Sequence, residues 1–338
     1  MESIELFLKS CRSQETRNSY KISFQKYMDF MGKNDLFCQN NPRLIDAKII
    51  EFIMYLRDQG KSYAAISNYL NAVKGFYKIN DVMLNLHKIN KFMPEPIKVN
   101  KDRAYTHEEI SRLLDVADER MRVVTLLLAS SGIRLGAIPT IRLHDLEDNK
   151  LCVYENTREE YITFITPECK KAIDFHLDMR ARYGEKLTDN SYLIREQFDL
   201  SDQFAIRNPK HVTHKLVQWK LMSLAEKCGI RKRADNKKTR QNIMIAHGFR
   251  KFFTTQLIHS KVNPEIREML LGHKIGLASA YYRPTEQEML EEYEKAIDNL
   301  TIDPANRLQR KIETLTIEKS RLDRIEEKML KMEQMYQK

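Results

Sequence analysis

The sequence predicts a mainly α-helical protein with a small antiparallel β-sheet, organised as two domains and a C-terminal helical tail. Apolar residues recur at helical spacing from the start of the chain to about residue 92, and no alternating pattern interrupts them. Only the segments LCVYE and YITFIT, between residues 151 and 166, are rich in β-branched and aromatic residues. Residues 306–338 contain no glycine or proline, which favours a continuous helix.

The N-terminal part, residues 1–93, is predicted to form a small helical bundle. Its clearest periodic segments run over Thr16–Met31, Leu44–Asp58 and Tyr63–Tyr77. The next segment, residues 94–103, reads PEPIKVNKDR and holds two prolines without strong periodicity. This composition predicts an interdomain linker, and a simple surface loop is the alternative interpretation.

Residues 104–300 are predicted to form a second, mostly helical domain. Thr106 and Glu109 make the capping-box pattern that begins a helix, and an apolar helix from Val123 to Ala129 leads to Arg134. The two strand segments follow, with NTRE between them as the turn. Further helices are expected over four segments: Pro167–Arg182, Asn208–Cys228, Ala246–His259 and Pro264–Leu271.

The C-terminal end of the chain is predicted to be helical. Residues 286–300 form an acidic amphipathic pattern, preceded by a second capping box of Thr285 and Glu288. In the tail, residues 301–338, apolar residues follow heptad spacing with one phase slip. This pattern predicts a short coiled coil or a docking helix, and an isolated, partly frayed helix is the alternative.

The composition favours a polyanionic partner. The chain has 338 residues, 42% of them hydrophobic, which excludes a disordered chain and allows two domains. The formal net charge is +10 and the pI is about 9.2, so nucleic acid is the first partner to consider. Without further motifs, a protein with a merely basic surface would explain the same numbers.

The cysteine pattern indicates a reducing compartment. The chain has 5 cysteines, none in a Cys-x-x-Cys pair: Cys11, Cys38, Cys152, Cys169 and Cys228. Scattered, unpaired cysteines are typical of the cytoplasm, so we expect a cytoplasmic, nucleoid-associated protein. No apolar run is long enough to span a bilayer, and the N-terminus does not have the pattern of a signal peptide.

The densest basic run lies between Gly229 and Gln241. Its candidate DNA-binding residues are Arg231, Lys232, Arg233, Lys237, Lys238 and Arg240. We interpret this run as a phosphate-contacting loop because it directly precedes His247. A mobile, solvated loop is the alternative.

Five side chains with phosphodiester chemistry are ordered along the second domain. His247 and Arg250 lie one helical turn apart, His273 follows in a Leu-Gly-His tripeptide, and Tyr282 comes nine residues later. A further arginine, Arg134, stands in SSGIRLGAIPTIRLHDLE. Arginine offers a rigid fork of donors to phosphate oxygens, histidine moves protons near neutral pH, and a tyrosine hydroxyl can attack phosphorus.

These motifs resemble the tyrosine recombinase (phage-type integrase) family over roughly Ile4 to Leu300. Gly132-Ile-Arg134 resembles the first arginine box, and His247-Gly-Phe-Arg250 resembles the His-x-x-Arg box. Leu271-Gly-His273 with Tyr282 resembles the last histidine and the nucleophile. The run YYRPTEQEMLEEYEKAIDNL further resembles the archaeal branch.

The resemblance implies a site-specific recombinase that cleaves and rejoins DNA through a 3′-phosphotyrosyl bond on Tyr282. It assigns Arg134 and Arg250 to the phosphate oxygens, and His247 and His273 to hydrogen bonding or proton transfer. No metal, ATP or other cofactor is implied. The first domain would be a core-binding module that clamps double-stranded DNA, the second the catalytic domain, and the active assembly a tetramer on DNA.

Two departures from the family pattern affect these assignments. The family's lysine in the β-hairpin is missing, because the turn from Glu155 to Glu160 contains no lysine. Either Arg158 in that turn acts electrostatically or Lys150 folds in, so both stay candidate catalytic residues and the general acid is open. The family also favours a glutamate where this chain has Ala137, which removes a contact that would position the arginine.

Other interpretations remain for the motifs. A non-cleaving DNA-binding protein on the same scaffold, or a type IB topoisomerase-like relaxer, would share most of these residues. A zinc site at the catalytic histidines is disfavoured, since no cysteine or carboxylate stands beside them at ligand spacing. His211 and His214 are read as surface or core residues, and Tyr281, adjacent to the nucleophile, as a packing residue.

Overall fold

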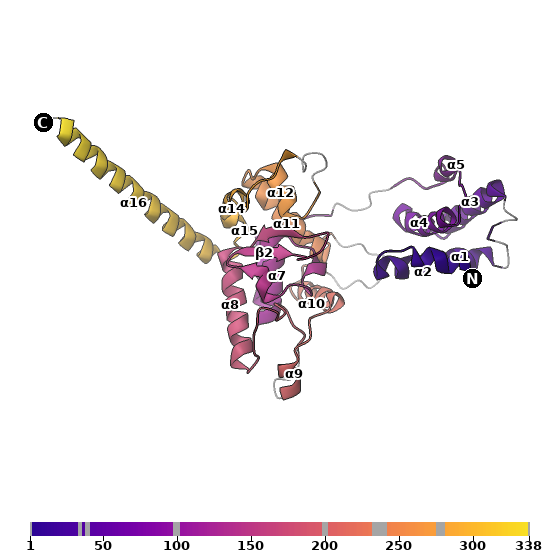
Figure 1. Cartoon of the computed structure of the whole chain (residues 1–338), viewed down its shortest axis with the longest axis horizontal. Coiled ribbons are helices and arrows are strands. Elements are labelled where there is room, and N and C mark those ends of the chain that lie inside the picture. The colour runs from indigo at the N-terminus through magenta and orange to yellow at the C-terminus, as the bar shows by residue number, and fades with distance from the viewer. Residues whose placement is uncertain are drawn as a thin grey trace. The chain divides into compact units, whose positions relative to one another are not determined.

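The computed structural model describes residues 2–32, 36–37, 41–96, 102–197, 202–231, 242–274 and 281–336. Its chain forms two compact units, Met1–Val99 and Asn100–Lys338. Among these residues most elements are helices, and the one sheet belongs to the second unit (Figure 1). The predicted fold class, mainly α with a small antiparallel sheet, is confirmed.

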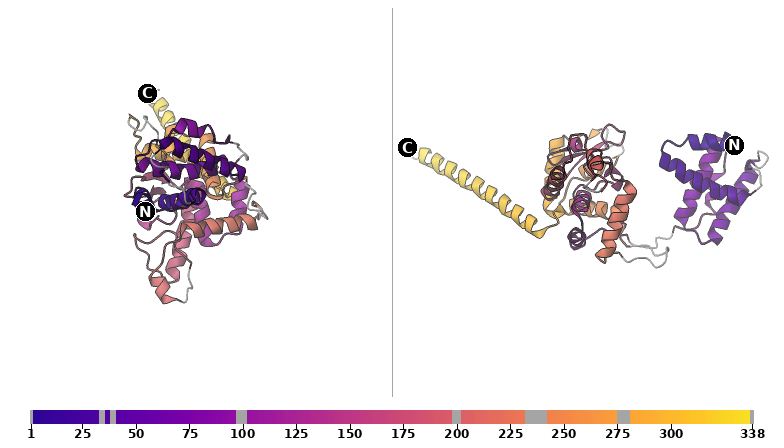
Figure 2. Two further views of the ribbon diagram at one scale, coloured as in Figure 1. Left: turned by 90° about the vertical axis from the view of Figure 1, so that its right-hand side faces the viewer. Right: turned by 90° about the horizontal axis from the view of Figure 1, so that it is seen from below.

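The N-terminal unit is a bundle of short and medium helices (Figure 2). They are α1 (Glu2–Lys9), α2 (Gln14–Met31), α3 (Pro42–Asp58), α4 (Tyr63–Ile79) and α5 (Leu86–Asn90). The side chains of Ser13, Asn41 and Ser62 accept backbone N–H groups at the starts of α2, α3 and α4, which satisfies donors that a helix leaves unpaired. The three helices predicted here are confirmed to within a few residues.

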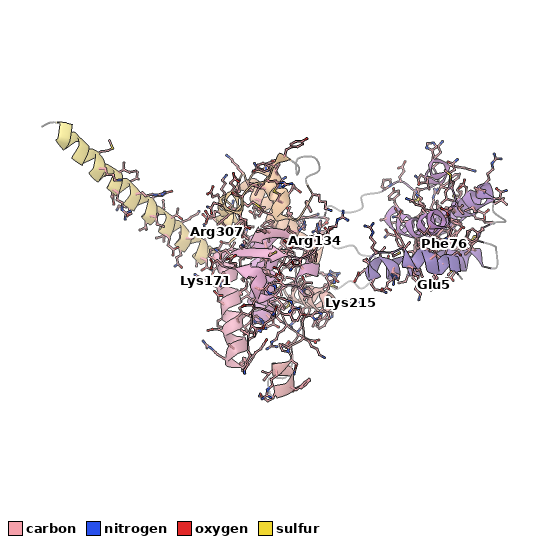
Figure 3. All side chains as sticks on the ribbon, in the orientation of Figure 1. Glu5, Phe76, Arg134, Lys171, Lys215 and Arg307 are labelled. Atoms are coloured by element: carbon pink, nitrogen blue, oxygen red, sulfur yellow. The ribbon has the colours of Figure 1, made fainter. Side chains whose placement is uncertain are left out.

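An aromatic core holds this bundle together. Phe24 and Phe76 lie with ring centroids 4.4 Å apart, and Phe76 occupies the centre of the unit (Figure 3). The hydroxyls of Tyr27 and Tyr77 are 3.1 Å apart, so these buried phenols pair their polar ends with each other. The bundle therefore has a hydrophobic core of its own.

The second unit is built around helix α7 (Glu119–Ser131), whose residues from Arg120 to Ser131 are nearly all buried. The unit also contains α6 (His107–Asp115), α8 (Pro167–Arg182), α9 (Gln203–Arg207), α10 (His214–Lys227), α11 (Ile245–His259), α12 (Pro264–Leu270), α14 (Glu286–Glu294), α15 (Ile297–Leu300) and α16 (Pro304–Tyr336). Two short 3-10 turns, η2 (Leu135–Ala137) and η3 (Leu143–Asp145), follow α7. Both predicted capping boxes, at α6 and α14, are present.

The sheet has three antiparallel strands in the order β1-β2-β3. They are β1 (Leu146–Glu147), β2 (Lys150–Val153) and β3 (Tyr161–Phe164), so the sheet has one strand more than predicted. Strand β1 was missed because its two residues are too few to show an alternating pattern. The β2–β3 turn, residues 154–160, carries left-handed backbone at Tyr154 and Asn156, with φ of 60° and 59°.

Two helix predictions in this unit were wrong. The helix predicted from Asn208 begins only at His214, because the preceding residues are extended and His211 bridges to Arg195. The acidic segment 286–300, expected to be one amphipathic helix, breaks into α14 and α15, and both pack on their own unit. Tyr293 of α14 is completely buried and donates its hydroxyl to Ser130 O at 2.9 Å.

The start of α16 is attached to the second unit, and the rest of its described length is exposed. Glu168 of α8 accepts the backbone N–H groups of Ile302 and Asp303 at 2.8 and 2.9 Å. Lys171 of α8 and Arg307 of α16 lie on this side of the unit (Figure 3). Among the described residues, no helix is both long and apolar enough to cross a membrane.

Candidate active site

Two glycines bring the arginine and histidine motifs close to the core. Gly132 ends α7 in the left-handed region with φ 62°, and a Cβ there would lie 2.3 Å from the ring of Phe253. Gly272 has φ 64°, and its Cβ would lie 2.5 Å from the ring of Tyr161. Only glycine fits either position, so the segments before Arg134 and His273 lie directly against α11 and β3.

Arg250 of α11 joins these two segments. Its guanidinium is buried, donates from Nη1 to Gly132 O at 2.7 Å, and donates from Nη2 to Leu271 O. Burial, followed by the nearby charge of Arg134, lowers the pKa of Arg250. The two predicted arginines therefore lie close enough to interact electrostatically, and the positive charge is held in a partly desolvated place.

His273 forms a hydrogen-bonded chain with Arg250 and Glu268. Its Nε2 lies 2.7 Å from Arg250 Nη2, and its Nδ1 lies 2.7 Å from Glu268 Oε2. Burial raises the pKa of Glu268, but the bonds from His273 and Arg267 outweigh it and hold that pKa below its usual range. Sequence reasoning missed Glu268, because a carboxylate at the end of α12 becomes a partner of His273 only once the turn at Gly272 is formed.

Arg134 and His247 are exposed, as His273 is. Arg134 stands at the extended start of η2, on the surface of the second unit (Figure 3). His247 stands in the first turn of α11 and lines an open groove of about 430 Å³ with Arg250 and His273. The structure thus places three of the five predicted residues around one groove, and Arg134 lies close enough to Arg250 to interact with it electrostatically, so both positive charges can act on one anion.

Two tyrosines of the β-hairpin also face this cluster, and sequence reasoning did not single them out. Burial raises the pKa of Tyr161, and the positive charges of Arg250 and Arg134 offset part of that rise. The same burial raises the pKa of Tyr154, again opposed by these arginines. Both phenols therefore lie near the guanidinium groups, and each offers an O–H that could meet a phosphate oxygen.

Tyr282 lies apart from the arginines. It is partly buried against the hydrophobic core. Burial raises its pKa, and the carboxylates of Glu288, Glu265 and Glu292 raise it further. Within the described part of the chain, no hydrogen bond joins Tyr282 to an arginine or histidine of the site, and the charges that act on it are carboxylates. The structure therefore does not bring the fifth predicted residue to the other four.

The prediction that Tyr281 is a packing residue was wrong. Its side chain is 91% exposed, whereas Tyr282 contacts the core. The two adjacent rings therefore occupy different environments, as expected for neighbours whose side chains point in different directions.

Lys150 and Arg158, the two residues that could take the role of the missing hairpin lysine, lie in different surroundings. Lys150 on β2 pairs with Glu147 at 2.7 Å and Glu286 at 3.3 Å, and these hydrogen bonds raise its pKa. Arg158 lies exposed in the β2–β3 turn, and within the described part of the chain it has no ion pair. A lysine held by two carboxylates is a weaker proton donor, which disfavours Lys150 as the acid.

Most of the basic run lies outside the described residues. Only Arg231 is described, with its backbone N–H donating to Ala225 O at 3.0 Å at the end of α10. The other candidates, Lys232, Arg233, Lys237, Lys238 and Arg240, fall in the segment 232–241 that the structure does not describe. His211 and His214 are exposed, in agreement with a surface interpretation.

Comparison with known proteins gives consistent matches. Residues 103–288, more than half of the chain, match the model of the phage integrase family. Tyrosine recombinase XerC of Leptospira interrogans serogroup Icterohaemorrhagiae is 23% identical over 299 residues, covering 84% of this chain and 88% of the relative. Tyrosine recombinase XerA of Pyrococcus furiosus is 23% identical over 301 residues, covering 85% and 92%. The XerC and XerA relatives are equally similar to this chain, so sequence identity does not assign it to the archaeal branch.

The fold is also similar to solved structures. A crystal structure of a lambda integrase tetramer bound to a Holliday junction matches with a TM-score of 0.57 and 14% identity. The match covers 84% of this chain and 78% of that one. At this identity the match shows a shared fold.

Proposed function

Because the chain belongs to the phage integrase family, we propose that it is a site-specific DNA recombinase that cleaves and rejoins strands through a phosphotyrosine. The observation that carries this proposal is the guanidinium of Arg250, which links the carbonyl of Gly132 to the Leu-Gly-His turn and contacts His273. Three motifs far apart in the sequence thereby meet at one cationic opening.

The proposed reaction begins when Tyr282 attacks a DNA phosphodiester and forms a bond between its oxygen and phosphorus. The bond between phosphorus and the 5′-oxygen breaks, the 5′-oxygen leaves with a proton as a 5′-hydroxyl, and the phosphate stays on the 3′ end as a phosphotyrosyl ester. A 5′-hydroxyl of another strand later reverses the step. The ester keeps the bond energy, so ATP is not needed. Arg134 and Arg250 stabilise the negative charge that develops on the non-bridging oxygens. His247 hydrogen-bonds one of these oxygens or takes up the phenol proton, and His273 accepts from Arg250 and holds its guanidinium in place.

The proposal requires Tyr282 to move. Its phenol now lies near carboxylates, and deprotonating it there would be unfavourable because negative charges raise its pKa. We propose that binding of DNA brings Tyr282 to the arginines, where positive charge and phosphate replace the carboxylate surroundings. The proton donor for the leaving oxygen is Arg158, Lys150 or one of the hairpin phenols, of which Lys150 is disfavoured by its two carboxylate partners.

We further propose that the units divide the work on double-stranded DNA. Residues 1–93 would clamp the duplex, residues 94–103 would link the domains, residues 104–300 would carry out catalysis, and residues 301–338 would serve assembly. The basic run 229–241 would contact phosphates. Four copies would act together on two duplexes, as the matched lambda integrase tetramer does on a Holliday junction, in the cytoplasm and close to the nucleoid.

The test uses nicked duplexes tiled across the DNA that flanks the gene. Full-length protein, Tyr282→Phe and the matched control Tyr281→Phe are incubated with each duplex and run on a denaturing gel. We expect an SDS-resistant protein–DNA band for the parent and Tyr281→Phe, and none for Tyr282→Phe. A band that disappears only in Tyr281→Phe would move the nucleophile to the exposed ring. Tight, salt-sensitive binding without any band would indicate a non-cleaving DNA-binding protein.

A further inference from the structure

A second cluster of chemically active side chains lies beside the β-hairpin. His144 and Asp145 end the turn η3, and Glu155 begins the β2–β3 turn. His144 Nε2 lies 3.0 Å from Glu155 Oε2 and 3.6 Å from Asp145 Oδ1. The three side-chain atoms all lie within 4.8 Å of one another, so one small group could contact all of them.

The neighbours of Asp145 leave one of its oxygens without a donor. Oδ2 accepts the backbone N–H of Arg142 at 2.7 Å, which fixes the carboxylate plane. Oδ1 is buried and has no hydrogen bond within the described residues, and the whole residue is only 8% exposed. A buried, unpartnered carboxylate oxygen is unfavourable unless a cation faces it.

The ring of His144 is oriented to face the same point. Its Nδ1 lies 3.1 Å from the carbonyl oxygen of Asp189, and a carbonyl can only accept, so Nδ1 carries the hydrogen. Nε2 lies 3.0 Å from Glu155 Oε2, so either it carries a second proton or, in the neutral ring, its lone pair and the two carboxylates face a cation between them. A histidine whose other nitrogen donates to a backbone carbonyl is the usual arrangement of a metal ligand.

We propose that His144, Asp145 and Glu155 bind a divalent transition-metal ion, Zn²⁺ or Mn²⁺, that ties the β2–β3 turn to η3. Bonds of about 2.0–2.2 Å in a tetrahedral site separate neighbouring ligand atoms by about 3.3–3.6 Å. The two distances from His144 Nε2, 3.0 and 3.6 Å, are close to this range, and all three atoms lie within 4.8 Å, so small side-chain shifts would complete the site. An imidazole ligand disfavours Mg²⁺ and Ca²⁺, which prefer oxygen atoms alone. The ion is structural, with no part in the strand transfer.

The site has a consequence for the β2–β3 turn. Glu155 lies between Tyr154 and Asn156, both of which adopt left-handed backbone. An ion bound to Glu155 would hold this unfavourable turn in one conformation. The turn also carries Arg158, so the metal would order the segment in which the family places its lysine. The binding site itself does not depend on the proposed recombination.

The experiment measures metal binding by the full-length protein, separately from any DNA reaction. Metal-free protein is titrated with Zn²⁺, Mn²⁺ and Mg²⁺ by calorimetry, alongside His144→Gln and Glu155→Gln. Both substitutions lie at exposed positions, and circular dichroism without metal shows whether each variant folds. The matched control is His214→Gln, which removes an exposed histidine from the i, i+3 pair with His211.

We expect one Zn²⁺ or Mn²⁺ ion per chain in the parent and in His214→Gln. His144→Gln and Glu155→Gln should each weaken the affinity by about tenfold or more. The visible spectrum of bound Co²⁺ should change in the same two variants only. The proposal is overturned if the parent binds neither ion stoichiometrically, or if Glu155→Gln keeps the parent affinity. It is also overturned if His214→Gln abolishes metal binding. The same holds if Mg²⁺ binds as tightly as Zn²⁺ both to the parent and to His144→Gln.

Discussion

Nε2 of His273 lies 2.7 Å from Nη2 of Arg250, and this contact determines the protonation of the ring. A guanidinium can only donate, so Nε2 must accept and carries no hydrogen. The hydrogen is then on Nδ1, which donates to Glu268 Oε2 at 2.7 Å. Glu268 thus holds His273 in the tautomer that is compatible with a cationic neighbour.

Replacing Glu268 by glutamine should slow DNA cleavage. The amide can donate to Nδ1, which would move the ring hydrogen to Nε2 and oppose the N–H groups of Arg250. We expect cleavage of a nicked duplex at saturating protein to slow by at least about tenfold, since a wrong histidine tautomer is costly in catalysis. DNA affinity in a gel shift should stay unchanged.

The matched control for Glu268 is Arg267→Gln. Arg267 pairs with the same carboxylate at 3.2 Å, but it does not contact His273. This variant should cleave at nearly the parent rate if Glu268 acts through the histidine. Equal slowing by both substitutions would instead indicate a general loss of local structure at the end of α12.

Gly272→Ala should destabilise the second unit more than Gly184→Ala does, although both glycines have left-handed backbone. Gly272 and Gly184 have φ of 64° and 88°, but a Cβ at Gly184 meets nothing within 4 Å. A Cβ at Gly272 would lie 2.5 Å from the ring of Tyr161. We expect about 1 kcal/mol lost from the free energy of unfolding in Gly184→Ala, and about 1–3 kcal/mol more in Gly272→Ala from overpacking.

Urea unfolding followed by circular dichroism measures both glycine variants. Gly272→Ala should also lose cleavage activity, because the carbonyl of Leu271 and the ring of His273 would shift from Arg250. If the two variants lose the same stability, the close approach of Tyr161 is not what requires glycine at position 272.

Local patterns were sufficient for the helices and for the order of the motifs, but not for contacts made by folding. The periodicity of α2, α3 and α4 and the caps of α6 and α14 can be read from neighbouring residues. Glu268 and the group of His144, Asp145 and Glu155 could not be predicted. Their partners meet only through the Gly272 turn and the register of β1 and β2, which periodicity does not determine.

The tyrosine pair shows the same limit of sequence reasoning. Spacing from His273 selects Tyr282, yet the exposed ring is Tyr281 and the carboxylates around Tyr282 come from α12 and α14. Which ring contacts the core depends on packing against the second unit, a tertiary property that the interval in the sequence could not reveal.

His176 should make the second unit less stable as the pH falls from about 7 to 5. It is buried on α8, and burial, followed by the charges of Arg180, Arg195 and Arg120, lowers its pKa from 6.5 to about 4, against the opposing charge of Glu185. Between pH 6.5 and about pH 4, His176 binds a proton in the unfolded chain but stays neutral in the folded protein. The free energy of unfolding therefore falls by about 1.4 kcal/mol per pH unit below about 6.5, up to about 3 kcal/mol.

Thermal unfolding of the parent and His176→Phe between pH 7.5 and 5 measures this effect. Phenylalanine keeps the ring volume and cannot be protonated, and Nε2 of His176 has no hydrogen bond to a described residue that would be lost. The Tm of the variant should depend less on pH across this range. Parallel curves for the two proteins would show that His176 does not control the pH dependence.

Removing residues 312–338 should weaken self-association without destabilising the second unit. The first turns of α16 belong to the unit, because Arg310 pairs with Asp298 at 3.2 Å and Thr301 and Ile302 are buried. Beyond them the helix exposes large apolar side chains at near-heptad spacing: Ile312, Leu315, Leu322, Ile325 and Met329. Each is more than half exposed, and an apolar stripe of this kind is typically covered by another helix.

Sedimentation velocity with and without target DNA compares the truncated and full-length proteins, and thermal unfolding checks their stability. The truncated protein should keep its Tm and its affinity for a single duplex, but form fewer complexes that contain several protomers. A longer truncation from Thr301 serves as the contrast, and it should lower the Tm because Glu168 would lose the backbone donors of Ile302 and Asp303. If removing 312–338 leaves the assemblies on DNA unchanged, the stripe on α16 has no role in joining copies of this chain.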